Sequence, residues 1–125
     1  GSMMVEVAES IAYDLKNEFI VITKNNGMID NFPSEAMVEV AGVLGKDGVT
    51  GYPFGKIKTF YKGLMENQFA YEKLTCEAWI EKDYTKALEA LALNRTVNDF
   101  DKAKAVLDDL MEANKDYWYL EKRDV

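Results

Sequence analysis

The sequence contains no histidine, and this absence limits the chemistry that the chain can perform by itself. Histidine is the side chain that most often acts as a general base near neutral pH and most often binds transition metals. Without it, the chain cannot form a Ser-His or Cys-His nucleophile pair. Cys76 is the single cysteine, and its apolar neighbours on a predicted helix indicate a small buried core residue. The chain therefore lacks the commonest general base and the commonest metal ligand, and one cysteine does not make a metal cluster.

Glycines recur between residues 42 and 55 and invite comparison with a phosphate-binding loop. A Walker loop needs four residues between its glycines and a Ser or Thr after the Lys. Here three residues separate Gly51 from Gly55, and Ile57 follows Lys56. The dinucleotide pattern G-x-G-x-x-G does not occur either. We interpret these glycines as turn residues of a hairpin.

Pairs of carboxylates are the remaining catalytic candidates, because two carboxylic acids can hydrolyse a glycosidic bond. Asp108 with Asp109, and Glu77 with Glu81, are such pairs on predicted helices. Acidic side chains are common on the solvated faces of amphipathic helices, and we prefer that interpretation. An independent carboxylate hydrolase stays as the weaker alternative.

Four polar residues are candidates for a substrate cleft. Asn25 and Asn26 precede Gly27 in a predicted turn, and loops on rigid scaffolds often carry binding residues. Gln68 and Glu72 lie on a long predicted helix where its apolar stripe weakens. The simpler interpretations, a plain turn and a solvent-facing helix surface, stay open beside the cleft.

The charge of the chain argues against several classes of partner. Its 15 basic and 22 acidic side chains give a net charge of −7, which repels nucleic-acid phosphates and anionic lipids. No apolar run approaches the roughly 20 residues that span a bilayer, and the start lacks the pattern of a signal peptide. A single cysteine suits a reducing compartment. We therefore predict a cytoplasmic protein that binds neither nucleic acid nor membranes.

Local patterns predict an α+β fold with a β-hairpin and a mainly helical C-terminal half. Helical spacing indicates helices near residues 5–17, 57–78, 84–93 and 98–111, the last beginning at a capping pair, Asn98 and Asp101. A β-rich run covers residues 19–23, and a hairpin covers residues 37–50. Gly1-Ser2 before Met3 resembles the remnant of a cleaved tag. We assign residues 1–3 to the tag and residues 4–125 to a single domain. The first helix is amphipathic, with an apolar face of Val5, Ala8, Ile11, Ala12 and Leu15.

Several short motifs resemble the C-terminal portion of family 4 glycoside hydrolases, in the same order along the chain. The segment NNGMIDNF at residues 25–32 is similar to that family's N-x-G-x-I-x-N, and AMVEV at residues 36–40 is similar to its V-V-E-V. The closing helices resemble those of the 6-phospho-α-glucosidase branch. The segments that carry this likeness are KGLMENQ (62–68), YEKLT (71–75), EAW (77–79) and LMEANKDYW (110–118).

The resemblance implies an enzyme that depends on NAD⁺ and a divalent metal, typically manganese, and hydrolyses phosphorylated disaccharides such as maltose 6'-phosphate. It also implies a fold like that of lactate and malate dehydrogenases, in which an N-terminal Rossmann domain precedes a mixed substrate domain. The nucleotide loop, the metal ligands and the catalytic residues of the family belong to its upstream portion. We therefore carry none of them over to this chain and expect it to be inactive alone.

The expected partners follow from the same resemblance. They are the missing N-terminal Rossmann portion and further copies in a homo-oligomer. The hairpin and long helix would pack against the missing portion, so the isolated chain should expose an apolar face and self-associate. The alternative is a stand-alone, non-catalytic module that binds other proteins or a sugar phosphate.

Overall fold

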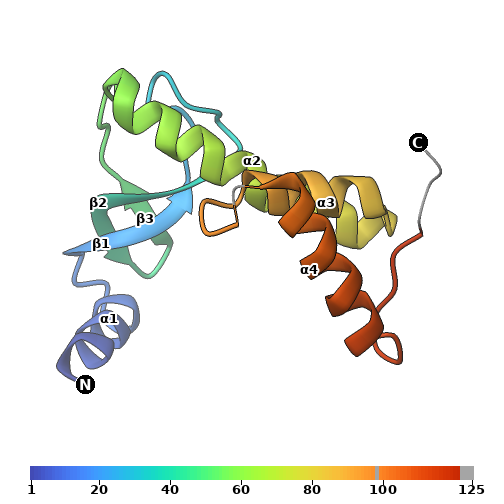
Figure 1. Cartoon of the computed structure of the whole chain (residues 1–125). Coiled ribbons are helices and arrows are strands. Elements are labelled where there is room, and N and C mark those ends of the chain that lie inside the picture. Colours follow the sequence, from blue (N-terminus) through green and yellow to red (C-terminus); the bar gives the residue numbers. More distant parts are fainter. Residues whose placement is uncertain (98, 122–125) are drawn as a thin grey trace. The chain divides into compact units, whose positions relative to one another are not determined.

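The computed structural model describes residues 1–97 and 99–121, and it divides into two compact units, Gly1–Lys62 and Gly63–Val125 (Figure 1). The elements are the helices α1 (Ser2–Ala12), α2 (Thr59–Glu81), α3 (Tyr84–Leu93) and α4 (Phe100–Ala113), and the strands β1 (Asn17–Lys24), β2 (Met37–Gly45) and β3 (Gly48–Gly51). This order confirms the predicted α+β class, with a hairpin followed by helices. None of the described helices combines the length and hydropathy needed to cross a bilayer.

The first unit contains an antiparallel sheet in the order β1-β2-β3. The hairpin between β2 and β3 turns where it was predicted, and Gly48 has a positive φ of 99° there. Gly42 and Gly51 have a different role, because they lie inside strands and face each other across the ladder. A Cβ on Gly42 would lie 2.7 Å from the carbonyl oxygen of Thr50. The interpretation of all these glycines as turn residues was therefore wrong, since close strand packing requires some of them.

One face of the sheet carries the buried residues of the first unit. Val21, Val38, Val40 and Leu44 lie on it and are less than a tenth exposed, as the alternation of a strand requires. The loop at residues 25–36 adds buried Ile29, Phe32 and Ala36. The side chain of Met28, in the same loop, lies over Gly51 next to Val40.

Helix α1 forms where the sequence predicts a helix, but it ends earlier, at Ala12. Asp14 and Lys16 then adopt positive φ angles of 52° and 56°, which end the helical path. Its single buried side chain is Ser10, whose hydroxyl donates a 2.6 Å hydrogen bond to the carbonyl of Leu44. The predicted apolar face, in contrast, is solvent-exposed. Its exposed residues are Val5, Ala8, Ile11, Ala12 and Leu15.

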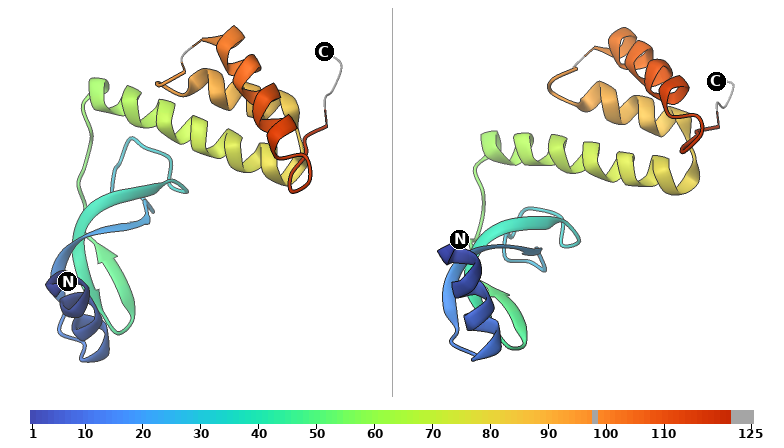
Figure 2. Two further views of the ribbon diagram at one scale, coloured as in Figure 1. Left: turned by 60° about the horizontal axis from the view of Figure 1, so that its bottom comes forward. Right: turned by 90° about the horizontal axis from the view of Figure 1, so that it is seen from below.

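The second unit is built on α3 and α4, which pack side by side (Figure 2). The buried residues of its core are Tyr84, Leu88, Ala103, Leu107 and Leu120. Two aspartates cap these helices: Asp83 accepts hydrogen bonds from the amides of Thr85 and Lys86, and Asp99 accepts one from the amide of Lys102. The predicted capping residue Asn98 lies outside the described residues.

Cys76 is exposed on α2, so its interpretation as a buried core residue was wrong. The buried residue of this helix is Ala78. Residues two positions apart in a helix differ by about 200° around its axis. Cys76 therefore points away from the side on which Ala78 is buried. Apolar neighbours in the sequence did not indicate burial here because they belong to different faces of the helix.

Candidate functional site

Asn25 organises the loop at residues 25–36 from inside. Its side chain is fully buried, and its Oδ1 accepts a 2.7 Å hydrogen bond from the amide of Ile29. Its Nδ2 donates to the carbonyl oxygens of Ile29, Phe32 and Pro33 at 3.0–3.2 Å. Both polar ends of the amide are thus used within the loop. The side chain of Asn25 therefore shapes this loop by bonding to its backbone, and it does not reach the loop surface.

Asn26 follows at the surface of the same loop. Its side chain is exposed, its φ is 44°, and its amide donates a 3.0 Å hydrogen bond to the carbonyl of Ser34. Gly27 continues the turn with a φ of 88°. Of the two asparagines proposed as cleft residues, Asn26 is the one whose side chain is presented to solvent.

Asn31 fastens the loop to the segment before α2. Its Oδ1 accepts a hydrogen bond from the amide of Ile57, and its Nδ2 donates one to the carbonyl of Ile57, both at 3.0 Å. A parallel bridge between Ile29 and Gly55 adds to the same junction. Sequence reasoning used Asn31 only as part of a motif. The sequence motif already contained both residues that hold the loop, since Asn25 and Asn31 lie on either side of the buried Ile29.

Gln68 and Glu72 contact each other on α2. They lie one helical turn apart, and the Nε2 of Gln68 donates a 2.7 Å hydrogen bond to the Oε1 of Glu72. Both side chains are exposed. This pair belongs to the second unit, whereas Asn25 and Asn26 belong to the first. A shared cleft for these four residues therefore stays a prediction.

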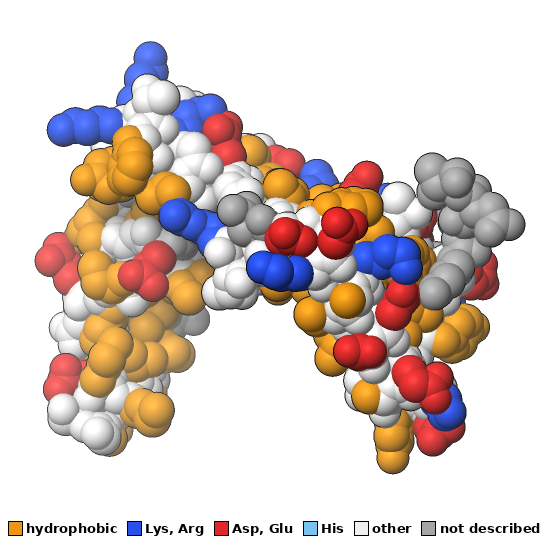
Figure 3. Space-filling view, in the orientation of Figure 1, with side chains coloured by type: hydrophobic (Ala, Val, Ile, Leu, Met, Phe, Trp, Pro, Cys, Tyr) orange, Lys and Arg blue, Asp and Glu red, His pale blue; other side chains and the backbone are white. Residues whose placement is uncertain are grey.

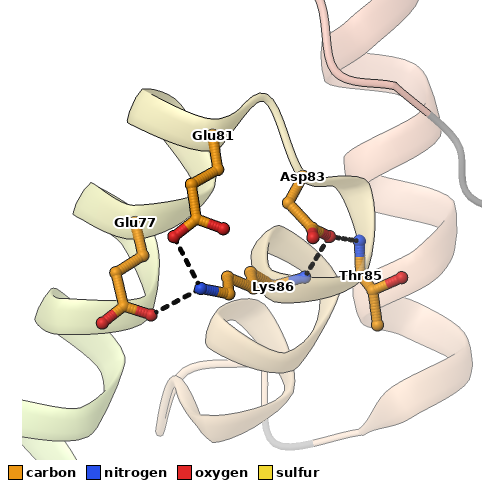
Figure 4. Close-up of polar contacts among 5 residues, drawn as sticks. All are labelled: Glu77, Glu81, Asp83, Thr85 and Lys86. Carbon is orange, nitrogen blue, oxygen red and sulfur yellow. Dashed lines mark hydrogen bonds and ion pairs between the residues drawn. The ribbon is translucent and has the colours of Figure 1, made fainter.

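The carboxylates of Glu77 and Glu81 both pair with the ammonium group of Lys86. Lys86 donates to Glu77 at 2.8 Å and to Glu81 at 2.9 Å, which links α2 to α3 (Figure 4). The hydrogen bond from Lys86 lowers the pKa of Glu77, and the two carboxylates raise the pKa of Lys86. A general acid for glycoside hydrolysis needs a raised pKa. The electrostatics of this pair therefore favour a structural role over acid catalysis.

Asp108 also has a structural role in the second unit. It accepts a 2.9 Å hydrogen bond from the hydroxyl of Tyr84 and a 2.8 Å one from Lys104. The exposed Asp109 beside it points to another side of α4. The two carboxylates that the sequence suggested as an acid and base therefore do not converge.

An apolar cavity of about 190 Å³ lies in the second unit. Its lining includes Trp79 and Trp118, whose rings stack with centroids 6.2 Å apart, together with Leu107 and Leu110. The described residues that line it include no charged side chain. The cavity can accept an apolar group, and Tyr71 is an ionisable residue in its lining.

Residues 1–97 match the model of the family 4 glycosyl hydrolase C-terminal domain. The chain belongs to glycoside hydrolase family 4. A 6-phospho-α-glucosidase of Leptotrichia buccalis is 50% identical to it over 118 residues, which are 94% of this chain and 27% of that enzyme.

Solved structures of family 4 enzymes have the same fold. A 6-phospho-α-glucosidase from gut microorganisms, in complex with NAD and Mn²⁺, has a TM-score of 0.92 and 46% identity over 96% of this chain and 28% of its own. A 6-phospho-β-glucosidase from Thermotoga maritima, with NAD and glucose 6-phosphate, has a TM-score of 0.81 and 30% identity over 97% of this chain and 31% of its own. The chain thus spans about 27% of the length of the relatives it matches.

The residues of this family 4 chain that the structure describes do not form a metal site by themselves. Within residues 1–97 and 99–121, no group of three or more His, Cys, Asp or Glu side chains is placed to hold a metal ion. The exposed Cys76 has no partner ligands of that kind around it in this part of the chain. We therefore derive no catalytic step through manganese from these residues.

Proposed function

We propose that this chain is the C-terminal part of an NAD- and manganese-dependent 6-phospho-α-glucosidase that hydrolyses phosphorylated disaccharides such as maltose 6'-phosphate. The observation that carries the proposal is the near full-chain match to a 6-phospho-α-glucosidase whose structure holds NAD and Mn²⁺. The α branch is favoured over the β branch because identity is 46% to that enzyme and 30% to the β-glucosidase of Thermotoga maritima.

The chain's own contribution would be structural. Asn25 and Asn31 hold a loop in a fixed conformation, and such loops on rigid elements often carry binding residues. Asn26, Gln68 and Glu72 are the exposed polar groups that could meet a sugar. The nucleotide, the metal and the catalytic residues would come from the upstream portion of the enzyme, so the chain alone is expected to be inactive.

The proposal is tested by an activity assay on 4-nitrophenyl α-glucoside 6-phosphate with NAD⁺ and Mn²⁺. The 125-residue chain is compared with a polypeptide extended upstream to the length of its relatives. We expect release of nitrophenol by the extended polypeptide alone, and loss of that release when NAD⁺ or Mn²⁺ is omitted. Activity of the short chain would contradict the proposal.

Four further measurements test the finer parts of the proposal. The β anomer of the same substrate tests the branch, and faster release from it would place the enzyme with the β-glucosidases. Calorimetric titration of the 125-residue chain with glucose 6-phosphate tests the alternative of a stand-alone binding module. Cell fractionation tests the expected cytoplasmic location, and sedimentation of the extended enzyme tests the expected homo-oligomer.

A further inference from the structure

The sheet of the first unit has an apolar face that faces solvent. Ile20 and Ile22 of β1 are 60% and 67% exposed, and Met37 of β2 is 62% exposed. The register places Ile20 opposite Ala41 and Met37 opposite Lys24. A sheet with one solvated face normally alternates apolar with polar side chains, whereas strands that are buried on both faces read as continuous apolar runs. The FIVI run of β1 at residues 19–22 is of the second kind.

Helix α1 also has an apolar face that faces solvent. Its apolar side chains are exposed, including Val5 at 57% and Ile11 at 44%, and Leu15 just after it is 50% exposed. The helix is held to β2 through Ser10, a single polar side chain. Helices shorter than about 12–15 residues are marginally stable in water unless they pack against other elements. An 11-residue helix that buries one serine therefore lacks most of the packing that would stabilise it.

We propose that these residues form one docking surface for the N-terminal portion of the same enzyme, and that docking stabilises α1. The docking surface is defined as Val5, Ile11, Leu15, Ile20, Ile22 and Met37. Figure 3 shows hydrophobic side chains gathered over α1 and the sheet. The inference rests on the proposed function, which supplies the identity of the partner.

The extent of the relatives argues for this partner. Residues 1–97 match a C-terminal domain, and the chain spans about 27% of the relatives' length, so most of such an enzyme is outside the structure. In our proposal this larger portion contacts the first unit at the docking surface, which is the broad apolar face of that unit. A second copy of the chain is the competing occupant.

The charged residues around the docking surface indicate the chemistry of the partner surface. Helix α1 carries Glu6 and Glu9 and no basic residue, whereas the outer face of the sheet has Glu18, Glu39 and the basic Lys24. The partner should therefore present an apolar centre, with basic residues opposite α1. The self-association expected from the sequence would bring the glutamates of two α1 helices together, which electrostatics disfavours.

The test is amide hydrogen exchange, measured peptide by peptide with mass spectrometry. The 125-residue chain is compared with the polypeptide extended upstream to the length of its relatives. We expect α1 to exchange at least ten-fold more slowly in the extended polypeptide. Equal exchange of α1 in the two polypeptides would overturn the proposal. So would protection of α1 in the short chain that rises with its concentration, because the occupant would then be a second copy.

A matched pair of variants tests the surface itself. Ile22→Asp places a charge on the docking surface, and Ile80→Asp places the same charge on α2 at a similarly exposed isoleucine, 78% against 67%. In the extended polypeptide, Ile22→Asp should return α1 to the fast exchange of the short chain, and Ile80→Asp should leave it slow. Equal effects of the two variants would refute the assignment. Ile22→Ser, which adds no charge, should give an intermediate exchange rate of α1. It replaces Ile22→Asp in the comparison if the aspartate variant fails to fold.

The activity assay keeps the two proposals apart, because it uses the same extended polypeptide. An inactive polypeptide with a protected α1 would refute the proposed function and support the docking surface. An active polypeptide with an unprotected α1 would support the function and refute the docking surface.

Discussion

Replacing Asn25 with alanine should be among the most destabilising single changes in the first unit. The substitution removes an acceptor for the amide of Ile29 and a donor shared by three carbonyl oxygens, all in a loop that encloses a fully buried side chain. A buried polar group left without its partner costs about 1–3 kcal/mol. The amide of Ile29 and at least one carbonyl would be left so. We therefore expect a loss of about 3 kcal/mol in the free energy of unfolding of this unit.

The assay is urea unfolding followed by the NMR amide signals of Val21 and Val40, which are buried next to the loop and report on the first unit. Asn26→Gly is the matched control. It removes a neighbouring amide side chain that is exposed, and glycine tolerates the positive φ of this position. We expect the control to change stability by less than about 0.5 kcal/mol.

The two asparagine variants together test whether the hydrogen bonds inside the loop determine its stability. If Asn25→Ala and Asn26→Gly shift the unfolding midpoint equally, the hydrogen bonds inside the loop do not determine its stability. Asn25→Asp separates the two ends of the amide, because it keeps the acceptor for Ile29 but turns the shared donor into a carboxylate that faces three carbonyl oxygens. It should destabilise the unit at neutral pH, and less so in acid, where the protonated carboxyl can donate again.

Three further predictions concern other parts of the chain. Gly42→Ala should destabilise the sheet by about 2 kcal/mol, because the new Cβ would meet the backbone of β3. Gly63→Ala, in open space on α2, should instead stabilise the helix by up to about 1 kcal/mol. Urea unfolding of the two variants and the wild type measures both effects. Since Lys86 lowers the pKa of Glu77, their ion pair contributes fully above the ordinary pKa of a glutamate, and the contribution is lost as the pH falls through the lowered value. Lys86→Met should therefore destabilise the chain near neutral pH, and its difference from the wild type should shrink in acid; a pH-independent difference would contradict the ion pair. Cys76 should react with iodoacetamide in the native chain at a rate close to that of the urea-unfolded chain, and strong protection would show that it is buried after all.

Elements whose stability depends on local chemistry were predictable from the sequence. The hairpin was found because residues 45–48 combine glycines with polar residues between two β-rich runs, and its turn requires the positive φ that Gly48 adopts. Helix α3 was found to the residue, since helical spacing of its apolar side chains coincides with its real bounds. Even where helix α1 ended earlier than expected, its existence was predicted correctly.

The roles of individual side chains were less predictable. Asn25 reads in the sequence as a turn residue that could face a ligand, and the structure buries it because four backbone groups of the loop need partners. No pattern in one sequence distinguishes an asparagine that binds its own loop from one that binds a substrate. The exposure of Cys76 was missed for a similar reason, since helix phase depends on which face the rest of the fold covers.

For the apolar face of α1, the burial that the sequence predicts differs from the exposure that the structure shows. Periodicity predicts correctly that Val5, Ile11 and Leu15 belong to one apolar face, but it does not say what covers that face. In a complete domain the covering element is part of the same fold, and periodicity then predicts burial. Here the face stays exposed, as does the apolar side of β1, and both lie in the unit that matches the C-terminal domain of a family of longer enzymes. An apolar periodicity without burial is therefore the observation on which the proposed docking surface rests.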